Sequence, residues 1–162
     1  MDRTIDRRVD HGGDDHRSIC PTSFLADRVA EHWSFGAPVR SGESVSGTIN
    51  RFSPRDVPAD VWARVEPVVK ESVTKVSFAN ATLAGKCTSV VGQLAVWADL
   101  IGHPVNAEAL FTPEFIDRFI TDGCTHHKPG TRTNYRGQLW QVGAAVVGAH
   151  TVPSPVGIPA CL

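Results

Sequence analysis

Residues 81–101 decide the fold class, and they read Ala-Thr-Leu-Ala-Gly-Lys-Cys-Thr-Ser-Val-Val-Gly-Gln-Leu-Ala-Val-Trp-Ala-Asp-Leu-Ile. Large apolar side chains recur there at spacings of four, three, four, three and four, at Leu83, Cys87, Val90, Leu94, Trp97 and Ile101. This is the period of an α-helix with one apolar face. The Gly-His-Pro sequence that follows predicts the end of the helix. A stripe of this kind must pack against other elements.

A helix is also expected before this stretch, running from Pro58 toward Val76 with Asp56 as its cap. Pro67 lies inside the pattern and predicts a kink or a division near Glu66. The same helix carries a row of valines that offers a seam for a homodimer, namely Val65, Val68, Val69 and Val73.

Two helices are expected after it. Thr112 and Pro113 predict the start of the first, with an apolar face of Phe115, Ile116, Phe119 and Ile120 and an end at Gly123. The second begins near Thr131 and directs Tyr135, Leu139, Val142 and Val146 toward the core. Its neighbouring stripe, roughly 90° around the axis, holds Arg132, Arg136, Trp140 and Gly143 and is expected to face a partner.

No stretch alternates with period two for long, so the predicted fold is all-α, a compact bundle of four to five helices over residues 53–150. Residues 1–52 have few large apolar side chains and are expected to form a poorly ordered tail, with a possible short helix at 23–33 and a linker at 40–52. Residues 151–162 are expected to form a Pro-rich tail.

The overall composition excludes some function classes. The chain has 162 residues and a formal net charge of −1, so any basic surface must be local. There is no apolar run of the length that spans a membrane, and four widely spaced cysteines are typical of reduced thiols. We therefore expect a cytoplasmic protein that has no membrane partner.

Charge is distributed unevenly near the C-terminus. No carboxylate side chain follows Asp122, whereas Lys128, Arg132 and Arg136 enter the start of the last helix. Free N–H groups and the helix dipole favour anions at such a position. The alternative is a solvated helix face whose arginines only aid solubility.

Residues 82–147 carry a family resemblance. They combine a long helix with Trp97 near its end, a connector, a short helix at 114–121, and a helix opening in the Thr/Arg-rich sequence GTRTNYRGQL at 130–139. This order resembles the N-terminal, SAM-like core-binding domain of tyrosine recombinases, the phage integrase family. The resemblance implies a helical clamp that holds duplex DNA by its backbone, with DNA-facing positions at Lys86, Lys128, Arg132 and Arg136.

The family's catalytic domain has no counterpart, because the only tyrosine, Tyr135, lies on the predicted core stripe. Nucleotide-binding and hydrolase motifs are also missing from the sequence, so no catalytic residue and no cofactor are expected. Cys124, His126 and His127, with Cys87 or Cys20, suggest a zinc site, but no second spaced pair of ligands follows. We expect no metal, and Cys87 is expected to be an inert core thiol.

The sequence thus favours a non-catalytic DNA-binding protein, an accessory or regulatory factor that binds double-stranded DNA weakly and salt-sensitively. Its expected contact residues are Lys86, Lys128, Arg132, Asn134, Arg136, Gln138 and Trp140. The cations would contact phosphates, and Asn134, Gln138 or DNA shape would give any sequence preference. The main alternative is a helical protein-interaction module that uses the same face and Trp140. A third is a helical assembly subunit, such as a phage structural protein.

Overall fold

The computed structural model describes Phe35 and residues 39–148. In this part of the chain all regular secondary structure is helical and there is no strand. The all-α prediction is therefore confirmed. The elements are α2 (Val45–Arg51), α3 (Ala59–Thr74), α4 (Ala81–Leu100), α5 (Ala107–Leu110), α6 (Pro113–Arg118), the π-helical turn η1 (Phe119–Gly123) and α7 (Pro129–Val147). The short helix expected at 23–33 and the tail at 151–162 lie outside the described residues.

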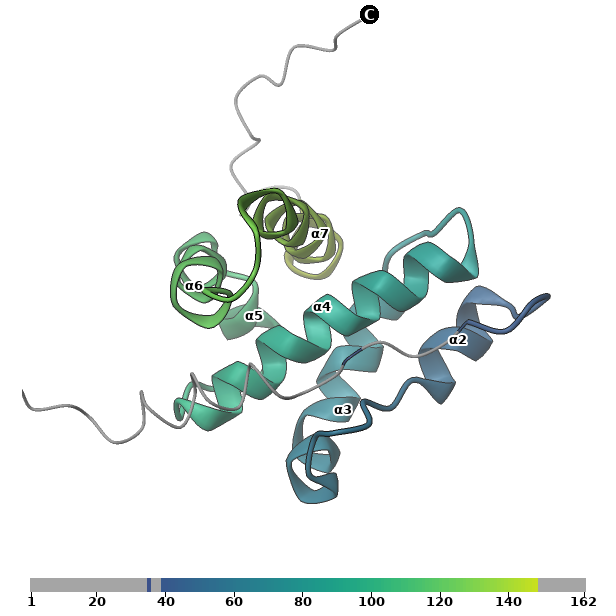
Figure 1. Ribbon diagram of the computed structural model, residues 1–162, viewed down its shortest axis with the longest axis horizontal. Coiled ribbons are helices and arrows are strands. Elements are labelled where there is room, and N and C mark those ends of the chain that lie inside the picture. Colours follow the sequence, from purple (N-terminus) through teal and green to yellow (C-terminus); the bar gives the residue numbers. More distant parts are fainter. Residues whose placement is uncertain (1–34, 36–38, 149–162) are drawn as a thin grey trace, which may run out of the picture.

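Helix α4 forms the centre of the fold, with α2 and α3 on one side and α5, α6 and α7 on the other (Figure 1). Its small residues allow neighbours to approach on several sides, and Ala84, Thr88, Ala95 and Ala98 are all fully buried. The expected stripe is buried from Cys87 to Trp97. Leu83 was placed wrongly on that stripe, because it lies in the first turn of α4 and its side chain is 46% exposed.

Helix α3 is continuous from Ala59 to Thr74, so of the two outcomes predicted near Glu66, a kink or a division, the division does not occur. Pro67 is exposed, and so is Ala63 one turn earlier, whose carbonyl has no proline N–H from which to accept a hydrogen bond. The N-cap is Pro58 and no side chain caps the helix, so Asp56 was also wrongly expected at this position.

The valines of α3 do not form a free surface. Val65, Val69 and Val73 are fully buried in the hydrophobic core, and Val68 packs against it. The seam that the sequence offered for a homodimer is therefore used inside the domain, where α3 packs along α4. This expectation was wrong because a valine stripe has the same pattern at a core as at an interface.

Residues 40–52, expected as linker, instead contain α2. The Ser44 hydroxyl accepts a hydrogen bond from the Gly47 N–H and caps the helix at a distance of 3.0 Å. Ile49 and Phe52 are 1% exposed, and the Phe52 ring lies 5.7 Å from that of Trp62. The packed domain therefore includes α2 rather than beginning at residue 53.

The segment after α4 follows its prediction closely. The Thr112 hydroxyl caps α6, and the expected apolar face of α6 and η1 is buried. A short helix that the sequence did not predict, α5, precedes it and buries Leu110. This region ends at Gly123. A Cβ atom there would lie 2.7 Å from Cδ2 of Phe119, so only glycine fits without a shift of the Phe119 ring.

Candidate nucleic-acid interface

The orientation of α7 determines which of its side chains are available. Leu139 and Val142 are fully buried as predicted, while Tyr135 and Val146 are partly buried. The neighbouring stripe is buried only at its C-terminal end. Gly143 is buried where a Cβ atom would lie 3.3 Å from Cβ of Phe111.

Arg136 and Trp140, on the same stripe, also have partners within the domain. The Arg136 Nε atom lies 3.0 Å from Oδ1 of Asp117 on α6, and both side chains are about half exposed. Trp140 packs against the hydrophobic core. Three of the four stripe residues, Arg136, Trp140 and Gly143, therefore contact other parts of the domain, and only Arg132 keeps a charge without an ion-pair partner among the described residues.

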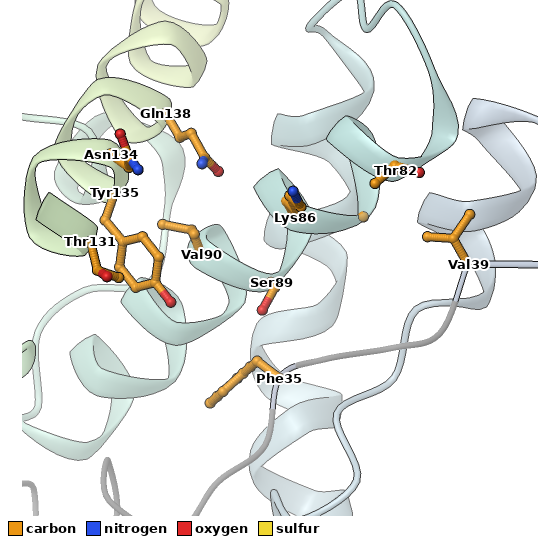
Figure 2. Close-up of a pocket in the computed structure, with 11 residues that line it drawn as sticks. Phe35, Val39, Thr82, Lys86, Ser89, Val90, Thr131, Asn134, Tyr135 and Gln138 are labelled. Atoms are coloured by element: carbon orange, nitrogen blue, oxygen red, sulfur yellow. The ribbon is translucent and has the colours of Figure 1, made fainter. Parts of the chain in front are cut away.

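A different face of α7 borders a hollow shared with α4. This groove has a volume of about 600 Å³. Figure 2 shows α7 along one wall, α4 along the other, and the segment of Phe35 and Val39 at the edge. The lining residues are Phe35, Val39, Thr82, Gly85, Lys86, Ser89, Val90, Thr131, Asn134, Tyr135 and Gln138.

The groove brings together three of the residues that the sequence predicted, namely Lys86, Asn134 and Gln138. Arg132 lies on the other side of α7, in a smaller hollow of about 230 Å³ that it shares with Arg136. Lys128 is the exposed N-cap residue of α7. The predicted residues thus lie on several sides of the first half of α7, with Lys86 on the neighbouring α4. Trp140 is the exception, because it packs against the core.

Electrostatically, both walls of the groove are free of acidic side chains. Residues 72–98 contain no Asp or Glu, and neither does the chain after Asp122. Among the described residues, no ion pair involves Lys86, Lys128 or Arg132. Six of the other eight described lysines and arginines have a carboxylate partner, namely Arg51, Arg64, Lys70, Lys75, Arg118 and Arg136, whereas Arg40 and Arg55 have no ion pair either.

Two contacts hold Tyr135 at the groove. Its hydroxyl lies 3.4 Å from Nε2 of Gln93, and the ring of His127 meets its ring edge-on with centroids 5.0 Å apart. Burial lowers the pKa of His127, and the neighbouring His126 lowers that pKa further. Gln138 has a buried Oε1 atom that accepts no hydrogen bond from the described part of the chain.

The cysteines and histidines of the loop before α7 are arranged differently from a ligand set. Cys124 is buried, and burial raises the pKa of its thiol to about 12, as it does for Cys87. The rings of His126 and His127 lie 4.0 Å apart, centroid to centroid. Within residues 39–148, no three His, Cys, Asp or Glu side chains are placed to hold a metal ion. Cys20 lies outside the described residues.

Sequence reasoning missed Thr82, Ser89 and Phe35 as groove residues. The available signal was the absence of acidic residues from 72–98, which matches the absence from α7. The hydroxyl residues themselves gave no signal, because hydroxyl side chains on a mostly apolar helix have no distinctive pattern.

Searches of protein-family models, curated proteins and solved structures gave no match to this chain. None of the helices in the described ranges is both long enough and apolar enough to cross a membrane.

Proposed function

We propose that this chain is a non-catalytic nucleic-acid-binding protein whose contact surface is formed by α4 and the first half of α7. One observation carries the proposal. The two helices that border the groove contribute no carboxylate to it. Three cations are without ion-pair partners in the described residues: Lys86 in the groove, Lys128 at the start of α7, and Arg132 on the other side of α7. Such a surface attracts phosphates although the whole chain has a charge of only −1.

The start of α7 supports the same reading. No side chain caps this helix, its first turn has no acidic residue, and Pro129 occupies its first position. Helix α4, by contrast, is capped by the Asn80 side chain, which accepts a hydrogen bond from the Leu83 N–H. The N–H groups at the start of α7 remain available to an anion, with Lys128 and Arg132 beside them.

Binding is expected to be weak and to depend on salt. The Asp117 carboxylate compensates Arg136, so three cations remain. Neutralising three phosphates gives a slope of about −2.7 for the logarithm of affinity against the logarithm of salt concentration. Affinity for duplex DNA should therefore fall about 40-fold between 50 and 200 mM salt.

A direct test titrates a labelled duplex with wild type and with Lys128→Ala/Arg132→Ala. We expect the double variant to lose most of the affinity at 50 mM salt. Arg51→Ala/Arg64→Ala removes the same charge from ion-paired positions and is expected to bind like wild type. Equal losses in both double variants would show that only net charge matters, and would exclude the proposed surface.

A protein partner is the second candidate, and one observation favours it. Leu83 is the one large apolar side chain that is exposed among the described residues. It lines a hollow of about 290 Å³ that adjoins the groove through Lys86 and Gln138. An apolar partner seated there would bind almost independently of salt, and Leu83→Asp would abolish its binding without affecting DNA binding at Lys128 and Arg132.

A further inference from the structure

We propose that the groove between α4 and α7 accepts one unpaired nucleotide, with its base toward Tyr135 and Phe35 and its phosphate toward Lys86. This inference rests on the proposed function and deepens it, because it names the form of nucleic acid that the surface recognises. Cations at the rim would hold the backbone, and the groove would select a strand whose bases are free to leave the stack.

The size of the groove sets the first limit. About 600 Å³ between two helices is within the range of pockets that hold one small ligand. A base inside a duplex is stacked and paired, so it must first be flipped out of the duplex at a cost of a few kcal/mol. A nucleotide in a single strand can enter without that cost.

The aromatic rings provide a surface for the base. Figure 2 shows Tyr135, on α7, and Phe35 toward the same end of the groove. Gln93 and His127 hold the Tyr135 ring in place. Phe35 packs at Gly92, where a Cβ atom would lie 3.4 Å from its Cδ1 atom. Phe35 is only 7% exposed, so the partly exposed Tyr135 provides the main face on which a base can stack.

The amides add hydrogen-bonding groups on the same wall. Asn134 and Gln138 are one helical turn apart on α7, and both line the groove. The Oε1 atom of Gln138 is buried and has no partner in the described part of the protein. A buried acceptor without a donor is uncommon in a native protein. Rotation of the Gln138 side chain into the groove would let the exocyclic amine of a base supply that donor.

The opposite wall suits a phosphate. Thr82, Lys86 and Ser89 lie along one side of α4 and present two hydroxyl groups and an ammonium group (Figure 2). No carboxylate lines the groove to compete for these donors. Aromatic surface, amides, hydroxyls and one cation are together the groups that a nucleotide requires.

The test compares four probes at 50 mM salt: a labelled oligo(dT) 12-mer, a 12-base-pair duplex, an abasic deoxyribose-phosphate 12-mer, and free mononucleotides as competitors. We expect wild type to bind oligo(dT) at least fivefold more tightly than either the duplex or the abasic strand. If millimolar mononucleotide displaces the strand, the groove binds a nucleotide and free nucleotides are among its ligands. Failure of displacement, with the fivefold preference retained, supports the proposal with the strand as ligand.

The groove itself is tested by Ser89→Phe, which places a ring in it. This variant should lose oligo(dT) binding at least tenfold and keep duplex binding within twofold. Ala145→Phe adds the same ring at an exposed position of α7 outside the groove and should change neither. Gln138→Leu provides a second test with little change of volume, and should lower oligo(dT) affinity about fivefold with an unchanged thermal midpoint.

Two results overturn the inference, and they are distinguishable. If wild type binds the duplex, the abasic strand and oligo(dT) equally, and the groove variants behave like wild type, the groove is not a nucleotide site but the proposed function stands. If no probe binds at 50 mM salt, both fail.

Discussion

The same substitution at two positions of α7 should have opposite effects on stability, and this difference tests the helix orientation on which the interface depends. Gly137 is exposed, and a Cβ atom there would meet nothing within 4 Å. Gly137→Ala should therefore stabilise the protein by about 1 kcal/mol, the difference in helix propensity between the two residues. Gly143→Ala brings the same gain in propensity, but its Cβ atom would lie 3.3 Å from Cβ and 3.5 Å from the carbonyl oxygen of Phe111.

Those two atoms of Phe111 move only with the backbone, so the overlap cannot be relieved by a change of rotamer. Overpacking of this kind costs about 1–3 kcal/mol, which exceeds or cancels the gain in propensity. The two variants should thus differ by about 1–3 kcal/mol, or at least about 4 °C in thermal midpoint for a domain of this size. Urea and thermal unfolding followed by circular dichroism measure both quantities. If Gly143→Ala stabilises as much as Gly137→Ala, α7 does not pack on Phe111 and the assignment of its faces fails.

Three other predictions follow from the same structure. Asp117→Asn releases Arg136 and should raise duplex affinity and steepen the salt slope by about 0.9. Asp60→Asn is the control and should leave the slope unchanged, since its partner Arg64 keeps a second carboxylate, Asp99. Identical slopes in both variants would contradict the compensation of Arg136. The folded state lowers the pKa of His127 below 6.5, so its stabilising contribution is present above pH 6.5 and is lost as pH falls. The free energy of unfolding should therefore change less between pH 7.5 and 5 in His127→Phe than in wild type. Parallel curves of this free energy against pH would refute the prediction. Gly123→Ala should lower the free energy of unfolding in urea by about 1–3 kcal/mol, because its Cβ atom would lie 2.7 Å from the Phe119 ring. An unchanged urea midpoint would show that η1 relaxes freely and would contradict this prediction.

The strongest sequence signals concerned long helices and their starts. The period of residues 81–101 predicted α4 to within one residue, and Thr112-Pro113 predicted the start of α6. These predictions succeeded because hydrophobic period and capping act locally. Helix α2 was missed because its buried Ile49 and Phe52 are separated by polar and small residues, and because seven residues form too short a window for a period.

The partners of each face were less predictable than the helices. The sequence placed Arg132, Arg136 and Trp140 on one stripe of α7, as in the structure, but it could not show that α5 and α6 would pack on that stripe. Asp117 is nineteen positions before Arg136, and no local rule joins them. Likewise, Lys86 and Gln138 share a groove only because α4 and α7 pack together. Tertiary contacts of this kind are absent from any single window of sequence.

The salt dependence of nucleic-acid binding tests the central claim most directly. Log affinity for oligo(dT) and for duplex is measured against log salt concentration for wild type and for Lys86→Ala, Lys128→Ala and Arg132→Ala singly. On the duplex we predict a wild-type slope of about −2.7, reduced in magnitude by about 0.9 in each variant; on the single strand the step is about 0.7. Slopes that do not change when these cations are removed would contradict the proposal that the acid-free surface of α4 and α7 binds phosphates.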